Sequence, residues 1–436
     1  MSASSRKLDR FATTFDHEGL VANAGLIVAA TLMARLGLLG LIERWVRTGS
    51  ANPGPKILTL VAAMVAGATH IDHVEMLRAG GTGAVLGFTP MAPSTVGSFL
   101  GTFTFGHARQ LEAVLARTLA RAWGLGAGPG RAPLTVDLDS TICEVRGKHK
   151  GGAAYGYTKV LGYHPLLAAR ADTREVLAAR MRKGSAGSAR GVVRFVDELA
   201  ASLRRAGAAR GATVRADSGF WSPKLIDRLD AHDVKWSITV ALGSAVRTAI
   251  QAIPESAWAD IAYTKGGRAQ VAETQYATGR GKARRTVRLV VRRTRLAQGA
   301  QQQMWPDWRH HAFITNTDHD TAAADEFHRA HAVVELAIRD LKEGSGLDHV
   351  PSGHYGANRP WLACAALAHN IGHWSALLAG APPAANRSRR TRLVALAAVA
   401  VNRSGTPTLR YPARWPWATQ FTATLSALRA LPGPSG

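Results

Sequence analysis

The sequence contains few cysteines and few acidic residues, and both shortages limit what the protein can be. Its two cysteines, Cys143 and Cys364, are too few for a zinc cluster of their own or for a disulfide framework, so we expect a reducing cytoplasm. Acidic residues number 30 against 54 lysines and arginines, which gives a formal net charge of +24. A surplus of this sign attracts polyanions, so nucleic acid is the expected partner class and a membrane surface is the alternative.

The sequence also lacks a long uninterrupted hydrophobic run. The two most apolar windows are Val21–Ile42, which contains Arg35, and Trp361–Gly380, which contains two histidines and an asparagine. The first residues, MSASSRKLDRF, have no apolar core of the kind that a signal peptide needs. We therefore expect no membrane span. At 436 residues, 46% of them hydrophobic, the chain is expected to form two or three units with a substantial interior.

Sequence patterns divide the chain into five regions. The first carries helical periodicity, the second alternates strands with helices, and the third is rich in strands. Helical patterns return in the fourth, and the fifth opens with the basic cluster NRSRRTRL. The predicted regions are 1–130, 131–233, 234–318, 319–385 and 386–436. A DNA-reading helix after Ser94 and a structural or dimerising helical domain are both compatible with the first region.

The segment Leu134–Thr141, LTVDLDST, alternates like a strand with one apolar face and one acidic face. Asp137 and Asp139 share the acidic face because side chains two residues apart in a strand point the same way. Burying an ionised carboxylate is unfavourable unless it is paired, hydrogen-bonded or bound to a metal. The strand is therefore either one arm of a cation site or an edge strand whose acids face water.

Two further acids stand where they would complete a cation site. Asp217 directly follows a short predicted strand, and Glu335 lies on a helix predicted over Thr321–Glu343. Together with Asp139 or Asp137, they supply the carboxylates needed to hold two Mg²⁺ ions. Such ions act in pairs about 3.5–4 Å apart in phosphoryl transfer.

The predicted helix of Glu335 carries basic residues on the same face. Helical spacing puts His328, His331 and Lys342 on that face, beside an apolar stripe that would face the core. Lys342 would then lie about two turns from Glu335, where it could contact a phosphate. An ordinary solvent-exposed face with a His–Glu contact explains the same spacing.

A basic strand face is predicted in the strand-rich region. Arg284, Arg288 and Arg292 lie at even spacing, so their side chains point to one side of the strand. Such a face either contacts phosphates or protects a solvated sheet edge from pairing with another chain.

Several long segments resemble the DDE transposases of bacterial insertion sequences, in the branch with a β-rich insertion between the second Asp and the Glu. The segments are DLDST, GKHKGGAAYGYTKVLGYHPLL, RADSGFWSPKLIDRL, HAVVELAIRDLKEGSGLDHVPSG and ANRPWLACAALAHNIGHW. The resemblance implies an α/β fold, in which an RNase H-like catalytic core is split by the insertion and preceded by an all-helical N-terminal domain.

The resemblance also implies the catalytic residues. Asp139, Asp217 and Glu335 would be the catalytic acids and would bind two Mg²⁺ or Mn²⁺ ions. Asp139 is favoured over Asp137 as the first acid, because related transposases tend to place the catalytic Asp directly before Ser or Thr. Asp137 then becomes the alternative first carboxylate or an acid that supports the metal ligands.

A signature of related families, Tyr-x2-Arg-x3-Glu-x6-Lys, covers the helix of the third acid. Glu335 and Lys342 match it, whereas His328 and His331 occupy the positions of Tyr and Arg. A histidine can still donate a hydrogen bond to a phosphate, in a pH-dependent way. The predicted DNA contacts are Lys342, His331, His328, Arg288 and Arg292.

The resemblance implies a homodimer acting on double-stranded DNA in the bacterial cytoplasm, at the nucleoid. It would cut at terminal inverted repeats and join the 3′-hydroxyl ends to target DNA. Two alternative functions are compatible with the same residues. One is a metal-dependent nuclease of the same core without strand transfer, and the other is an inactive DNA-binding descendant of a transposase.

Overall fold

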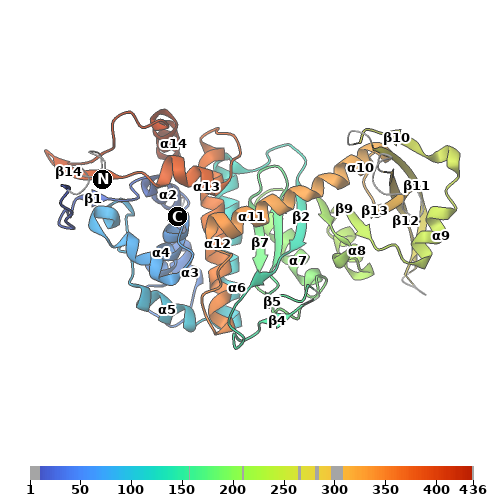
Figure 1. Cartoon of the computed structure of the whole chain (residues 1–436), viewed down its shortest axis with the longest axis horizontal. Coiled ribbons are helices and arrows are strands. Elements are labelled where there is room, and N and C mark those ends of the chain that lie inside the picture. Colours follow the sequence, from blue (N-terminus) through green and yellow to red (C-terminus); the bar gives the residue numbers. More distant parts are fainter. Residues whose placement is uncertain are drawn as a thin grey trace.

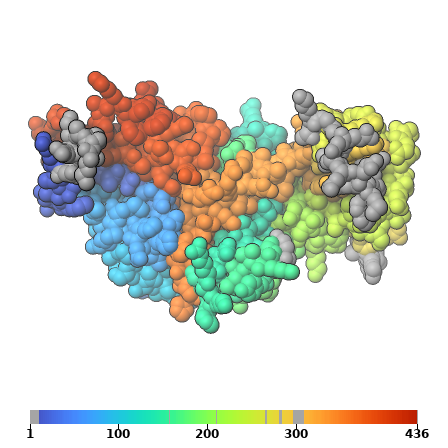
Figure 2. Space-filling view, in the orientation of Figure 1, coloured from blue at the N-terminus to red at the C-terminus, as the bar shows by residue number. Residues whose placement is uncertain are grey.

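The fold is that of a computed structural model, which describes residues 10–156, 158–208, 211–263, 267–279, 284–295 and 308–434. Figure 1 shows an elongated molecule with N-terminal helices at one end and a strand-rich region at the other. The long helix α12 (Tyr355–Leu378) stands between the N-terminal helices and the sheet. Figure 2 shows the surface of the same side, where the last part of the chain lies beside the first.

Helices fill the N-terminal part of the chain and pack around α12. They are α2 Leu26–Arg35, α3 Leu38–Trp45, α4 Pro53–Ala66, α5 Pro93–Gly101 and α6 Phe105–Ala122, with the short helices η1 Ile71–Leu77, η2 Gly80–Val85 and η3 Trp123–Ala127. Helix α12 contacts α2, α4, α5 and α6, and every residue from Trp361 to Ile371 is buried. A helix buried on all sides is a core element.

Among the helices of the described residues, no single helix is long and apolar enough to cross a membrane. Two pairs of helices, α2 with α3 and α4 with η1, together have the length and composition of a membrane span, but each pair is sharply bent at its junction.

A nine-stranded mixed sheet forms the centre of the molecule. Its strand order is β10-β11-β12-β13-β9-β8-β2-β6-β7. The bounds are β2 Thr135–Ser140, β6 Leu166–Arg170, β7 Val176–Arg180, β8 Thr213–Ala216, β9 Lys235–Val240, β10 Ala259–Ile261, β11 Arg268–Thr278, β12 Arg285–Arg295 and β13 Arg309–Thr315. Strands β2, β8 and β9 run parallel, and the other pairs are antiparallel. A small separate sheet holds β3 Cys143–Glu144, β5 Leu161–Tyr163 and β4 Ala154–Tyr155.

The strand-rich region predicted over 234–318 is part of this sheet and does not form a sheet of its own. Its first strand, β9, pairs with β8, and β13 then pairs with the other edge of β9. Strands β10–β13 therefore prolong the central sheet, together with the helices α9 Ser244–Gln251 and η5 Glu255–Ala257. Period-2 patterning predicts strands, but it does not say which edges pair.

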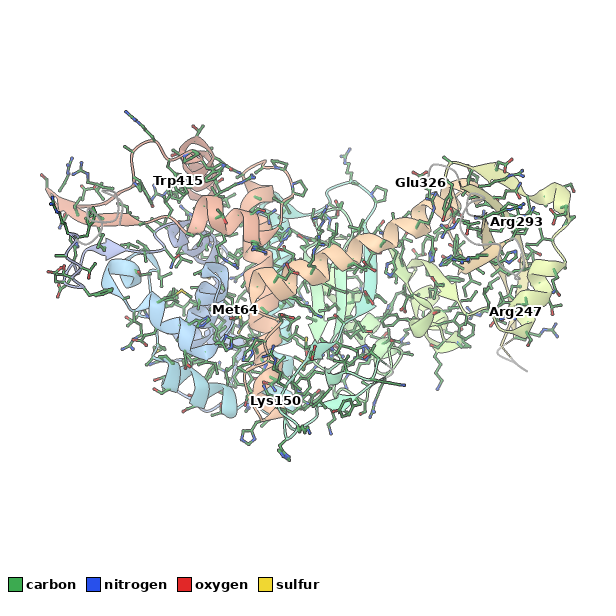
Figure 3. All side chains as sticks on the ribbon, viewed as in Figure 1. Met64, Lys150, Arg247, Arg293, Glu326 and Trp415 are labelled. Atoms are coloured by element: carbon green, nitrogen blue, oxygen red, sulfur yellow. The ribbon has the colours of Figure 1, made fainter. Side chains whose placement is uncertain are left out.

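Aromatic and charged side chains fix the far end of the sheet. The guanidinium of Arg293 lies 4.2 Å from the ring centre of Trp258 and 4.6 Å from that of Trp308. It also pairs with Glu255, with an Nη1–Oε1 distance of 2.8 Å. Figure 3 shows Arg293 among the strands of this end, with Arg247 on the neighbouring helix.

The helix predicted as one piece over Thr321–Glu343 is divided. It consists of α10 (Thr321–Arg329), a 3-10 turn η7 (Ala330–Val333) and α11 (Val334–Ser345). Figure 1 shows this chain of helices crossing in front of the sheet from the strand-rich end towards α12. Val334 and Ala337 pack against Ala169 of β6, which holds α11 on the sheet.

The remaining elements complete the two flanks. Helices α7 (Val192–Arg205) and α8 (Pro223–Ala231) pack against each other, and η4 (Ser218–Phe220) follows β8. The C-terminal elements are α13 Asn386–Arg389, η8 Arg390–Val394, β14 Ala398–Arg403, β15 Thr406–Arg410 and α14 Ala418–Ala430. Strand β14 pairs with β1 (Leu20–Val21), and α14 packs on α2, so the C-terminal region joins the N-terminal helices.

Candidate active site

Asp137 and Asp139 point to the same side of β2, but their surroundings differ. Asp137 is fully buried, and Nε and Nη2 of Arg215 donate to its Oδ1 and Oδ2 at 2.7 and 2.9 Å. Nδ1 of His331 lies 2.8 Å from the same Oδ1. The pairing follows from the sheet register, because Asp137 and Arg215 stand opposite each other on the parallel strands β2 and β8. Asp137 is therefore engaged in the interior, where it orients its two partners.

Asp139 lies at the end of β2 and lines a cleft. Its Oδ1 accepts a hydrogen bond of 2.6 Å from the backbone N–H of Ser140. Burial raises the pKa of Asp139 to about 6, and the charges of Asp217 and Glu335 act in the same direction. The Ser140 N–H and His331 act in the opposite direction. Asp139 thus stands close to both other predicted acids.

Asp217 and Glu335 reach this place from two different elements. Asp217 directly follows β8 and caps η4, because its Oδ1 accepts a 3.0 Å hydrogen bond from the N–H of Gly219. Glu335 lies in the first turn of α11, which crosses the sheet face that carries Asp139. Both side chains are exposed. The structure therefore brings together the three acids that the sequence predicts as catalytic.

The cleft has a volume of about 350 Å³ and mixes both signs of charge. It is lined by Asp139, Ser140, Thr141, Glu335, Ile338, Arg339, Lys342, Glu343 and Asp348. Lys342 donates from Nζ to the carbonyl oxygen of Ile142 at 2.7 Å, which holds its ammonium group at the rim. A phosphate could place one oxygen against the Lys342 ammonium and its other oxygens against cations held by the carboxylates.

Sequence reasoning missed three residues that line this cleft. Arg339 and Glu343 follow Glu335 at intervals of four, so the helical period alone would have placed them on the same face. Asp348 lies in the loop after α11, and no periodic signal marks it. Arg339 adds a second cation next to Lys342.

The donor set fits a divalent cation. Carboxylate oxygens are the ligands that Mg²⁺ and Mn²⁺ prefer. The raised pKa of Asp139 reflects burial and mutual repulsion, and a bound cation would relieve the repulsion. Asp139, Asp217 and Glu335 are the residues that could hold it.

A second cluster of ligand-type side chains lies behind α11. Asp340, His369 and His373 are buried, and their ligand atoms lie within 4.8 Å of one another. His373 Nε2 lies 2.9 Å from Asp340 Oδ2, and the backbone N–H of Asn386 donates to Oδ1 at 2.8 Å. Buried Arg389 interacts with Asp340 and balances its charge. We interpret the cluster as a polar connection that fixes α11 to α12 and α13.

The structure corrects the prediction that His328 contacts DNA. Only 4% of His328 is exposed, and its two ring nitrogens lie 2.8 Å from Ser237 Oγ and 2.9 Å from Thr239 Oγ1. Its ring stacks on Phe313 with 4.1 Å between centres. Burial lowers the pKa of His328 to about 2, so the ring is neutral and structural.

The two predicted arginine contacts are engaged with acids of their own region. Arg288 pairs with Glu273 of β11 through an Nε–Oε2 contact of 3.0 Å. Arg292 pairs with the buried Asp325 of α10 at 3.2 Å. These pairs join β12 to its neighbours, although Asp325 also pairs with Arg329 of α10 at 2.8 Å.

Comparison with known proteins identifies the family. The sequence matches the family described as "Transposase DDE domain group 1" over residues 5–433. The chain belongs to this transposase family. No curated protein matches it. Among solved structures it resembles a piggyBac transposase in a synaptic complex with hairpin DNA, with 12% identity over 86% of this chain and 79% of the other. The TM-score of 0.43 is too low to establish a common fold, so the family match carries the assignment.

Membership of the DDE transposase family agrees with the chemistry of the cleft. Asp139, Asp217 and Glu335 occur in the order Asp, Asp, Glu, and the charges of Asp217 and Glu335 both act on Asp139. The family generally uses divalent metals, and it acts on DNA.

Proposed function

We propose that this protein is the transposase of a bacterial insertion sequence. It cuts double-stranded DNA at terminal inverted repeats and joins the resulting 3′-hydroxyl ends to target DNA. The observation that carries the proposal is that Asp139 and Glu335 share one cleft with Lys342, while the charge of Asp217 also acts on Asp139. The strands β7-β6-β2-β8-β9 are proposed as an RNase H-like core, extended by β10–β13.

Different side chains would have different roles in phosphoryl transfer. Asp139, Asp217 and Glu335 would hold two Mg²⁺ or Mn²⁺ ions. Bound there, such ions supply activation of the attacking oxygen and charge stabilisation at the leaving oxygen. Lys342 and Arg339 would pair with phosphate oxygens and position the DNA backbone.

His331 supports the same site from the side. Asp137 fixes its ring through Nδ1, and the charge of His331 acts on Asp139. We propose that His331 contacts the DNA phosphate backbone next to Asp139, at the position where related families carry Arg. Asp137 and Arg215 are then positioning residues that hold His331.

We propose that the protein acts as a homodimer on DNA, in the bacterial cytoplasm at the nucleoid. Its net charge of +24 supports contact with a long polyanion. The dimer would bring the two ends of one element together.

The experiment that tests this proposal measures cutting and joining separately. The purified chain is incubated with Mg²⁺ and DNA fragments that carry the inverted repeats flanking its gene, with a supercoiled plasmid as target. We expect cleavage at the repeat ends and covalent joining of those ends to the plasmid. Cutting without joining would favour the metal-dependent nuclease, and binding without cutting would favour the inactive descendant.

A further inference from the structure

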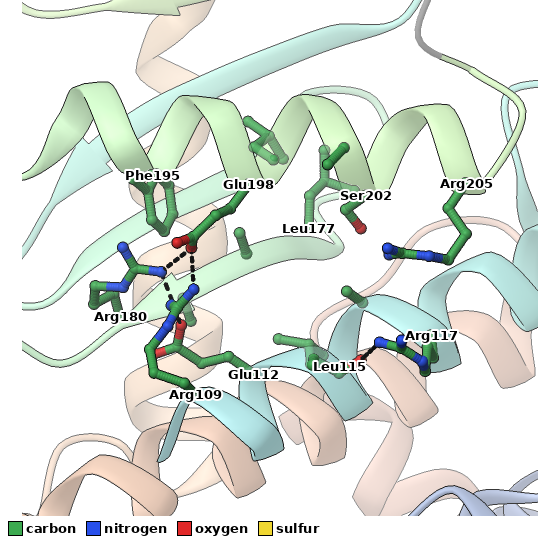
Figure 4. A pocket seen from close by; sticks show the side chains of 16 residues that line it. Arg109, Glu112, Leu115, Arg117, Leu177, Arg180, Phe195, Glu198, Ser202 and Arg205 are labelled. Carbon is green, nitrogen blue, oxygen red and sulfur yellow. Dashed lines mark hydrogen bonds and ion pairs between the residues drawn. The ribbon is translucent and has the colours of Figure 1, made fainter. Parts of the chain in front are cut away.

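A cavity of about 200 Å³ lies between α6, α7 and the edge strand β7. It shares no lining residue with the catalytic cleft. Figure 4 shows its two ends: at one, arginines and glutamates are bonded to each other, and at the other, Arg117 of α6 and Arg205 of α7 face each other. The two ends therefore differ in whether their arginines have carboxylate partners.

At the first end, every arginine has a glutamate partner. Arg180 pairs with Glu112 at 2.9 Å and with Glu198, and Arg109 pairs with the same two glutamates. Burial raises the pKa of Glu112 to about 7, against the effect of Arg109. Arg194 also pairs with Glu198, so three arginines share two glutamates and each guanidinium of this end already has a carboxylate partner.

The second end has positive charge without a matching acid. Arg117 makes one hydrogen bond, from Nη1 to the carbonyl oxygen of Ala113 at 3.3 Å, and its guanidinium lies 3.4 Å from the ring centre of Trp45. Within the described part of the chain, Arg205 pairs with no carboxylate. Burial lowers the pKa of Arg117, and the charges of Arg205 and Arg44 lower it further.

A buried hydroxyl also points to a missing ligand at this end. Ser202 of α7 is only 3% exposed, and among the described residues its Oγ has no hydrogen-bond partner. An unpaired buried hydroxyl is unfavourable unless a ligand accepts a hydrogen bond from it or donates one to it. Figure 4 shows the Ser202 oxygen on the side of the cavity that Arg117 and Arg205 line.

We propose that this end of the cavity binds a phosphate group, held by the guanidinium groups of Arg117 and Arg205 and by the hydroxyl of Ser202. Guanidinium forks match phosphate oxygens, and stacking on Trp45 holds one fork in place before binding. That the phosphate belongs to the DNA backbone, outside the position that is cut, rests on the proposed function. A free phosphate or a nucleotide would present the same chemistry.

The first arm of the test measures binding of the full-length chain to duplex DNA by fluorescence anisotropy at several salt concentrations. The variants are Arg117→Ala and Arg205→Ala, and the matched control is Arg204→Ala. Arg204 is an exposed neighbour on α7 that contacts His232 instead. We expect each variant to bind roughly tenfold more weakly and the salt slope to fall by about one, while the control changes neither.

The second arm titrates the same proteins with inorganic phosphate in a calorimeter. Saturable binding to the native chain that both variants lose would support the site even if DNA binding is unchanged, and would identify free phosphate as the source. The proposal is overturned if both variants match Arg204→Ala in both arms. Neither arm involves cleavage, so failure of the proposed enzymatic activity would be seen separately.

Ser202→Ala provides an independent check if Arg117→Ala folds poorly. Removing the unpaired hydroxyl should leave the unliganded protein at least as stable, because no hydrogen bond is lost. The same change should weaken binding of inorganic phosphate or DNA severalfold. Unchanged binding of both would contradict a role for Ser202 and the site as proposed.

Discussion

Asp137 and Arg215 form a two-point ion pair inside the protein, and the same carboxylate holds His331. Asp139, two residues along the strand, faces the cleft and shares it with Glu335. Two acids on one face of β2 therefore have different surroundings, one paired in the interior and one lining the cleft.

This difference predicts opposite effects for two similar substitutions. Asp137→Asn leaves the buried guanidinium of Arg215 uncompensated, so it should lower the free energy of unfolding by roughly 3–5 kcal/mol. Asp139→Asn removes a carboxylate whose pKa is raised by burial, so stability should stay equal or increase while DNA cleavage is lost. Urea unfolding and cleavage assays on both variants measure this. A stable, inactive Asp137→Asn protein beside an active Asp139→Asn protein would reverse the assignment.

The two histidines predicted as DNA contacts should respond differently to removal. His331→Ala should slow cleavage by on the order of 10–100-fold with little effect on stability, because the half-buried ring supports the cleft. His328→Ala removes a buried ring with two hydrogen-bond partners, so it should destabilise the fold and leave cleavage per folded molecule unchanged. Thermal unfolding and single-turnover cleavage separate the two effects. If His331→Ala and His328→Ala slowed cleavage equally and left stability unchanged, both histidines would be DNA contacts.

The polar connection behind α11 predicts a sensitive glycine. A Cβ at Gly372 of α12 would clash with Oδ1 of Asn386, so Gly372→Ala should displace Asn386 and destabilise the protein by about 1–3 kcal/mol. The control is Gly40→Ala in α3, where a Cβ meets nothing within 4 Å. That change should be neutral or stabilising by up to about 1 kcal/mol. The urea concentration at the unfolding midpoint should therefore fall in Gly372→Ala and stay the same or rise in Gly40→Ala. Equal shifts of the two midpoints would contradict the packing described.

The three acids of the candidate site could be proposed from the sequence because each stands at a position that patterning can recognise. Asp139 alternates with apolar residues in a strand, Asp217 follows a strand, and Glu335 lies beside a helical apolar stripe. The sequence does not give the pairing of Asp137 with Arg215, because it depends on which strands become neighbours.

The error at His328 has a local cause. A continuous helix would keep His328 and Glu335 on one face, but the 3-10 turn η7 lies between them. Its residues advance by about 120° instead of 100°, so four of them rotate the face by roughly 80°. The ion pairs of Arg288 and Arg292 could not be predicted for a different reason: their acidic partners lie on β11 and α10, which no local pattern connects with β12.

A buried glutamate makes stability depend on pH. Trp123 and Trp374 donate to Glu175 at 2.6 and 2.8 Å, and burial raises its pKa from 4.5 to about 7. The native state therefore binds more protons than the unfolded state between these values, so stability should fall as the pH rises from about 5 to 7. The full shift corresponds to on the order of 3 kcal/mol.

Glu175→Gln should flatten this dependence, as measured by urea unfolding at pH 5 and pH 7.5. Glu112, whose pKa is also raised to about 7, titrates in both proteins, so the difference between them isolates Glu175. An unchanged slope in the variant would show that Glu175 titrates alike in the folded and unfolded chain.

The central claim is that Asp139, Asp217 and Glu335 form a metal-dependent catalytic centre, and Glu335→Gln tests it most directly. Cleavage of DNA that carries the flanking inverted repeats is measured with Mg²⁺ at matched DNA occupancy, with Glu343→Gln as control because Glu343 lines the same cleft two turns further along α11. We predict that Glu335→Gln binds DNA but does not cut it, whereas Glu343→Gln keeps most of its activity. Metal-dependent cutting by Glu335→Gln at the native rate would contradict the account.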